Sequence, residues 1–206
     1  MRFPAARLIL ALAAAAFSAI VAARAGPAPS LAEPSRPQAD DPQPLSPSDM
    51  RAELYGRLAA SQDADETEGL VGLLMAAYAQ SGSDTGDLLL ERARKAIAAK
   101  DYKAAEKILD AAIAFLPDCA DAWNVRAKLR YLDGDVDGAM ADIAETLKRE
   151  PRHLGALLGM ASILESRDKD NDALKIYERV LVIAPHWKSA EEAEARLKAK
   201  IAGESL

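Results

Sequence analysis

Three prolines divide much of the chain into segments of equal length. Pro117, Pro151 and Pro185 follow one another at intervals of 34 residues. Self-similarity at a period of roughly 20 to 50 residues is typical of repeat proteins, in which each unit buries its apolar face against the next one. The spacing therefore predicts an array of stacked units that share a continuous core.

The apolar residues of the first unit recur with the period of an α-helix. Between residues 105 and 116 they stand at positions i, i+3, i+4, i+7, i+8 and i+11, which form one wide stripe on a helix. Pro117 ends this helix because proline cannot continue it, and Asp118 is placed to cap the next helix. The stripe consists of Ala105, Ile108, Leu109, Ala112, Ile113 and Leu116.

The units match one another at more positions than their prolines. A small residue, Ala105, Ala139 or Ala173, stands at the same place in each, and turn residues precede it near positions 100, 134 and 168. These matches resemble the tetratricopeptide repeat (TPR), in which a small residue lets the two helices of a pair pack closely. The resemblance implies an all-α fold, a right-handed helical-repeat solenoid of helix pairs. The aligned units are residues 86–119, 120–153 and 154–187.

The pattern weakens on both sides of the three units, as it does at the ends of repeat arrays. Residues 49–85 are expected to form a divergent N-terminal helical pair, with helices over about 48–61 and 66–80 and no closing proline. Residues 188–206 are expected to form a C-terminal capping helix, because apolar residues such as Leu197 lie on one side of it and charged residues lie elsewhere.

The first 48 residues have a different character. Residues 1–25 contain Arg2 and Arg7, then an apolar run, then small residues around Arg24, which is the pattern of a secretory signal peptide cleaved near Ala25. An uncleaved membrane anchor is the alternative, although the run is shorter than the ~20 apolar residues of a spanning helix. Residues 26–48 hold seven of the eleven prolines and predict a disordered tether.

The acidity of the chain narrows the classes of partner. The formal net charge is −6, and loss of Arg2, Arg7 and Arg24 with a signal peptide would change it to −9. Nucleic acids and anionic lipids are bound mainly through Lys and Arg, so neither is expected as a general partner. We also expect no stable membrane insertion once the signal peptide has been removed.

Three local features resemble a narrower group of TPR proteins. They are the loop at residues 81–85, the Trp123-Asn124 segment, and residues 150–156. Their combination is similar to small exported TPR proteins of alphaproteobacteria. The resemblance implies a Gram-negative periplasm and a role in upkeep of the cell envelope, and it implies no known ligand.

Residues that could support catalysis or metal binding are few. The two histidines, His153 and His186, each follow a repeat-closing proline, whereas a metal site needs ligands clustered at local spacing. The same scarcity argues against a histidine-based catalytic triad. We therefore expect no metal, no cofactor and no enzyme activity. The lone Cys119 is either a partly buried small residue or a reactive thiol that could link two copies.

A partner is expected on the concave surface that the first helices of stacked pairs form. Asn124 and Tyr131 are the strongest single candidates, because an amide and an aromatic side chain suit contacts with a peptide. The alternatives are a core position for Tyr131 and a helix-start role for Asn124. The predicted partner-binding residues are Asp87, Leu90, Glu91, Arg94, Asp121, Asn124, Lys128, Tyr131, Leu158, Ser162 and Glu165.

These features predict a non-catalytic periplasmic scaffold or adaptor for protein–protein interaction, which supports assembly or integrity of the cell envelope. Its partner is expected to be a protein or a peptide segment. A self-assembling structural protein is the alternative, and a homo-oligomer would follow from it. The carboxylate clamp of chaperone-binding TPR proteins is not expected, since only one matching position is basic. Those positions are Leu90, Arg94, Val125, Gly155 and Gly159.

Overall fold

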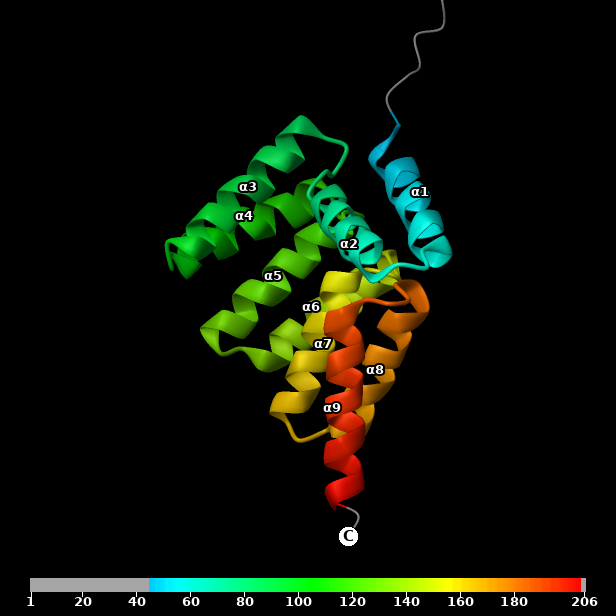
Figure 1. The fold of residues 1–206 in the computed structure, drawn as a ribbon. Helices are drawn as coiled ribbons and strands as arrows, with labels where there is room; N and C mark the ends of the chain where they lie inside the picture. The colour runs from blue at the N-terminus through cyan, green and yellow to red at the C-terminus, as the bar shows by residue number, and fades with distance from the viewer. Residues whose placement is uncertain (1–44, 205–206) are drawn as a thin grey trace, which may run out of the picture. The chain divides into compact units, whose positions relative to one another are not determined.

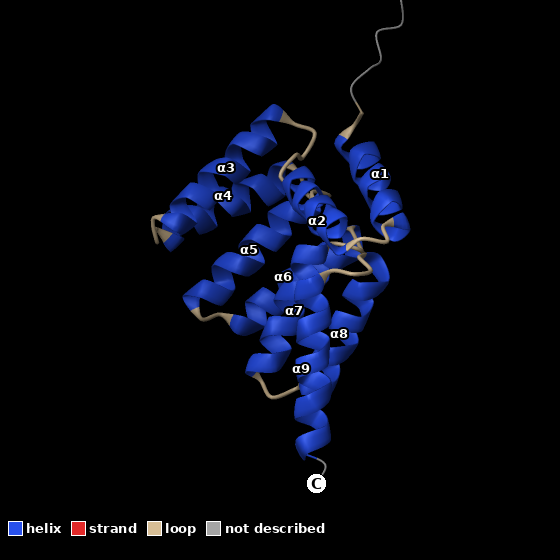
Figure 2. Ribbon diagram, in the orientation of Figure 1, coloured by secondary structure: helices blue, strands red, loops and turns tan. Residues whose placement is uncertain are grey.

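The computed structural model describes residues 45–204, and every regular element in that range is an α-helix (Figure 2). The predicted signal peptide and nearly all of the predicted tether lie outside the described residues. The all-α prediction is confirmed. The helices are α1 (Pro47–Ala60), α2 (Ala64–Tyr78), α3 (Asp84–Ala98), α4 (Tyr102–Phe115), α5 (Ala120–Asp133), α6 (Val136–Arg149), α7 (Leu154–Ser166), α8 (Asp170–Ile183) and α9 (Lys188–Glu204).

The three predicted repeats correspond to three helix pairs (Figure 1). α3 packs with α4, α5 with α6 and α7 with α8, and successive pairs meet through α4 with α5 and α6 with α7. Ala105, Ala139 and Ala173 are completely buried, at positions where a larger side chain would hold the helices of a pair apart. The chain is therefore the helical-repeat solenoid that the sequence predicts.

The turn inside each pair uses the same backbone conformation in every repeat. Lys100, Gly134 and Asp168 stand 34 residues apart, and their φ angles are 60°, 91° and 54°. This left-handed region favours glycine, yet only the second repeat has one there. In the first two repeats an aspartate follows, Asp101 or Asp135, and its side chain caps the next helix.

The boundary between the first two repeats differs from the sequence-based expectation. The prediction that Asp118 caps α5 is wrong, because α5 begins at Ala120 and the cap position is Cys119, whose side chain makes no capping bond. At the equivalent place one repeat later, His153 caps α7. Its Nδ1 accepts a hydrogen bond from the backbone N–H of Ala156 at 3.2 Å.

The N-terminal helix pair packs on the third repeat. α1 and α2 pack against each other, and α1 also contacts α8. Side chains of this pair, including Leu58 and Leu74, share one core with Leu157 of α7, Val180 of α8 and Trp187. The divergent N-terminal helical pair thus shares its core with the third repeat, which is the last one in the array.

Polar contacts hold this pair on the loops that close the second and third repeats. The hydroxyl oxygens of Tyr55 and Tyr78 lie 2.5 Å apart, and they lie 2.9 and 3.2 Å from the carbonyl oxygen of Arg152. Thr67 donates to the carbonyl of Pro185 at 3.1 Å. Burial raises the pKa of both tyrosines, that of Tyr78 to about 12, so both hydroxyls stay protonated at neutral pH.

α9 covers the third repeat on the side of α8. Ala190, Ala193 and Leu197 turn a buried face toward the array, as expected of a capping helix. Arg196 binds Glu165 at 2.7 Å, which ties α9 to α7. Within residues 45–204 no helix combines the length and apolar character needed to span a membrane.

Candidate binding groove

Two adjoining hollows lie along the first helices of the repeats. The α5–α7 hollow has a volume of about 300 Å³, and the α2–α5 hollow, which α3 also borders, has a volume of about 310 Å³. Asn124 and Lys128 of α5 line both hollows. The two hollows together are the α5 groove.

The α5–α7 hollow combines a buried apolar lining with a polar rim. Ala127, Ile143 and Ile163 supply the buried apolar surface. Gly155 and Gly159 of α7 have no side chains, so nothing from that face of α7 fills the space. The rim consists of Asn124, Lys128, Tyr131 and Ser162.

An ion pair lies in the α2–α5 hollow. Arg94 of α3 binds Asp121 of α5, and this contact joins the first repeat to the second. Lys128 differs from both, since it has no hydrogen bond or ion pair with any described residue. Asn124 likewise makes no hydrogen bond in the described part of the chain. The middle of the groove therefore presents two side chains with free hydrogen-bonding groups.

His153 lies next to Tyr78 of α2 in the lining of the α2–α5 hollow. Its ring is 1% exposed and stacks on the ring of Tyr78 with 3.8 Å between the centroids. Because Nδ1 accepts the N–H of Ala156, the proton of the neutral imidazole belongs on Nε2. Nε2 has no hydrogen-bond partner, and Asp121 Oδ1 lies 3.8 Å away. Through its ring stacking and its capping bond, His153 holds α2 against the start of α7.

Six of the predicted partner-binding residues line the α5 groove. Tyr131 is 40% exposed, so it is not the core residue that the alternative interpretation proposed. Asn124 lies inside α5 beyond the cap position, and its side chain caps no helix. The roles of these residues in binding stay predictions. The six are Arg94, Asp121, Asn124, Lys128, Tyr131 and Ser162.

Two predicted apolar contacts lie in the packing between helices. Leu90 is 1% exposed and belongs to the core around Leu109, so its prediction as a partner contact is wrong. Leu158 is half-buried against the core that α2 shares with α7 and α8, and it lines neither hollow.

Three predicted acidic contacts lie outside the groove and already have partners. Asp87 accepts hydrogen bonds from the backbone and hydroxyl of Ser81 at 2.6 and 2.5 Å, and it shapes the loop before α3. Glu91 pairs with Lys95 one turn along α3, and that hydrogen bond lowers its pKa. Glu165 is held by hydrogen bonds from α8 and α9, of which the bond from α9 does most to lower its pKa.

Sequence reasoning missed several residues that shape the groove. Gly155 and Gly159 stand four residues apart in an apolar helix, and this spacing could have indicated a face of α7 without side chains. Met75 and Tyr78 of α2 line the α2–α5 hollow, and no local pattern indicates that α2 lies there.

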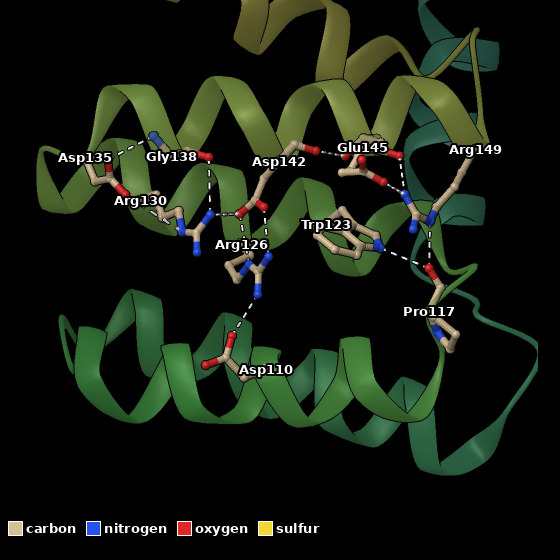
Figure 3. Close-up of polar contacts among 11 residues, drawn as sticks. Asp110, Pro117, Trp123, Arg126, Arg130, Asp135, Gly138, Asp142, Glu145 and Arg149 are labelled. Carbon is tan, nitrogen blue, oxygen red and sulfur yellow. Dashed lines mark hydrogen bonds and ion pairs between the residues drawn. The ribbon is translucent and has the colours of Figure 1, made fainter.

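A separate polar network joins the first two repeats (Figure 3). The buried carboxylate of Asp142 accepts two hydrogen bonds from Arg126 and pairs with Arg130 at 2.9 Å. Arg126 also pairs with Asp110 of α4 at 2.8 Å. The hydrogen bonds from Arg126 to Asp142 contribute most to raising the pKa of that guanidinium. Asp142 thus ties α5 to α6 inside the second repeat, and the pair between Arg126 and Asp110 joins that repeat to the first.

Trp123 extends this network toward the repeat boundary. Its indole N–H donates to the carbonyl of Pro117 at 3.0 Å, and Arg149 donates to the same oxygen at 2.6 Å (Figure 3). The guanidinium carbons of Arg126 and Arg149 lie 4.9 and 4.5 Å from the ring centroid of Trp123. The tryptophan therefore fixes the proline loop onto α5 and α6.

The described residues contain few groups suited to covalent or metal chemistry. Cys119 is half-buried with a free thiol, and burial raises its pKa, which lowers the fraction of reactive thiolate. No three His, Cys, Asp or Glu residues gather into a metal-binding cluster in the part of the chain that the structure describes.

Comparison with known proteins places the chain in a family. No family model matches it. It is 40% identical over 158 residues to a TPR repeat-containing protein of Rhizobium etli, an alignment that covers 77% of this chain and 78% of the relative. The chain belongs to the tetratricopeptide-repeat family. This relative also supports the resemblance to TPR proteins of alphaproteobacteria.

Other TPR proteins agree with this assignment. Tetratricopeptide repeat protein 36 of Xenopus tropicalis is 32% identical over 127 residues, which cover 57% of this TPR chain and 58% of that protein. The TPR domain of Arabidopsis OM64 superposes with a TM-score of 0.50 at 21% sequence identity, covering 55% of this chain and 94% of that domain. This structural likeness concerns the fold.

Proposed function

We propose that this TPR protein is a non-catalytic scaffold that binds a peptide segment of a partner protein in the α5 groove. The observation that carries the proposal is the groove itself, where Asn124 and Lys128 have free polar groups beside a buried apolar lining. Pockets that bind ligands combine apolar surface with a few placed polar groups in this way.

The size of the groove favours a peptide segment over a large cofactor. Each hollow, at about 300 Å³, lies at the lower end of the range for small-molecule pockets, which is roughly 300 to 1,000 Å³. A few side chains of an extended segment would fill it. Such a contact is much smaller than a standard protein–protein interface, which buries about 1,600 Å², so we expect modest affinity.

Gly159→Leu tests the groove without disturbing the fold. A Cβ atom at this position would lie 3.5 Å from Ile143 Cδ1, an ordinary contact, and leucine is a better helix former than glycine. The test is capture of partner proteins by crosslinking. We expect the partners captured by the wild type to be lost in the Gly159→Leu variant and also in the double variant Asn124→Ala, Tyr131→Ala. Lys107→Glu on α4 is the control. Survival of every partner in both groove variants would show that binding occurs elsewhere.

We further propose that the protein acts in the periplasm of a Gram-negative bacterium and supports assembly or integrity of the cell envelope. Support comes from the signal-like residues 1–25 and from the resemblance to exported TPR proteins. Fusion of residues 1–48 to a phosphatase that is active only outside the cytoplasm tests export. An inactive fusion would contradict it, and unchanged detergent sensitivity of a deletion strain would contradict the envelope role.

A further inference from the structure

We infer that the α5 groove selects an extended segment in which an acidic side chain stands close to an apolar one. The inference rests on the proposed function and adds the chemistry of the partner. The apolar side chain occupies the α5–α7 hollow. The carboxylate binds Lys128 and Asn124, which lie where the two hollows meet.

The distribution of charge in the groove favours an acidic partner. Arg94 and Asp121 compensate each other, so their ion pair adds no net charge. Lys128 has no ion-pair partner among the described residues, and it leaves the lining with one uncompensated positive charge. The chain as a whole has a formal net charge of −6. An acidic segment is therefore attracted to this place and repelled by much of the remaining surface.

Two free donors are available for one carboxylate. Asn124 and Lys128 stand four residues apart on α5, so their side chains share one face of the helix. The Nδ2 atom of Asn124 lies 3.5 Å from the Cβ position that Gly155 leaves empty, which places this donor at the edge of the α5–α7 hollow. A carboxylate can accept one hydrogen bond from an amide and another from an ammonium group.

The absence of side chains at two glycines provides the apolar subsite. Gly155 and Gly159 expose the backbone of α7 beside Ile143 and Ile163. A side chain entering the hollow would displace water from this apolar surface. Tyr131 stands on the rim, 40% exposed, where its ring can cover the incoming side chain.

The occupant is an internal stretch of a partner chain rather than its C-terminus. Hollows extend from Asn124 and Lys128 toward both α3 and α7. A terminal carboxylate bound at this place would leave one hollow without ligand. An acidic side chain on a continuing segment fills both.

Calorimetry with blocked peptides on the full chain tests this selection. The reference peptide is Gly-Leu-Asp-Leu-Asp-Gly, acetylated at its N-terminus and amidated at its C-terminus. It is compared with one peptide in which both Asp residues are Asn and one in which both are Lys. We expect the Asp peptide to bind about threefold more tightly than the Asn peptide, as one exposed ion pair allows, and the Lys peptide to bind most weakly. Lys128→Glu reverses this order. Lys107→Glu makes the same charge change on α4 and keeps the wild-type order.

The outcomes separate this inference from the proposed function. If Gly159→Leu abolishes binding while Lys128→Glu leaves the order unchanged, the groove binds peptides and the acidic selection is wrong. If Gly159→Leu changes neither peptide binding nor partner capture, the proposed function fails as well. Failure of the Asp peptide to bind at millimolar concentration also overturns the inference. Helical circular dichroism shows that each variant is folded.

Discussion

Asp142 ties the two helices of the second repeat together through its buried carboxylate. Its side chain is 3% exposed and holds both Arg126 and Arg130. Asp142→Ala leaves these charges without their shared partner, and breaking one side of a buried ion pair is strongly destabilising. We expect a loss of about 3 kcal/mol in the free energy of unfolding measured with urea. This is the low end of the range of roughly 3 to 5 kcal/mol for a broken buried ion pair, because Arg130 is 26% exposed.

A surface pair provides the matched control. Asp137 binds Arg167 at 2.5 Å, but its side chain is 89% exposed. Solvent screens such a pair, so Asp137→Ala is expected to leave the unfolding midpoint nearly unchanged. Equal midpoint shifts for the two alanine variants would show that the ion pairs of Asp142 do not stabilise the second repeat.

At the scale of helices, α2 is coupled to elements far away in sequence. Leu74 is completely buried and shares its core with Leu157, Val180 and Trp187. Leu74→Ala is expected to cost about 3 kcal/mol, within the range for leucine-to-alanine changes in cores. The loss of hydrogen-exchange protection should be centred on α1, α2, α7 and α8, which share this core, while α3 and α4 change less.

Leu109→Ala removes the same side-chain atoms from the core of the first repeat. Its effect on hydrogen exchange should be centred on α3, α4 and α5. A Leu74→Ala variant that loosens α3 and α4 first would contradict the packing of the N-terminal pair on the third repeat.

At the scale of the whole molecule, the N-terminal pair packs on the third repeat. We therefore expect unfolding to be more cooperative than contacts between neighbouring repeats alone would make it. Stability in a simple repeat array is the sum of contacts between neighbours, so separate parts can unfold separately. Here Trp123 reports on the core of the first two repeats, and Trp187 reports on the core that α2 shares with the third. We expect both to unfold together.

Single-tryptophan variants measure this directly. Trp123→Phe leaves the fluorescence of Trp187, and Trp187→Phe leaves that of Trp123. In each variant the fluorescence transition in urea should coincide with the loss of helical circular dichroism. Fluorescence midpoints that depart from the circular dichroism midpoint would indicate that the two cores unfold independently.

Much of the fold could be predicted because its causes are local and recur. The 34-residue spacing, the alanines at Ala105, Ala139 and Ala173, and the turn positions all repeat in sequence and in structure. The groove was predicted less completely. The register of the first helices indicated Asn124 and Tyr131, but it also indicated Leu90, because periodicity alone does not show which side of an apolar stripe the next helix covers.

By itself, the sequence determined the repeat, its three units and the helices that form them, because period and local turn chemistry depend on residues near one another in the chain. Only the tertiary structure decided that α2 packs on the third repeat and that Tyr78 and His153 stack in the lining of the α5 groove. Those contacts join residues far apart in the chain: Tyr78 and Leu154 are separated by 76 positions, and Thr67 and Pro185 by 118. They depend on which apolar surfaces remain uncovered after the repeats have stacked, and no local pattern records that.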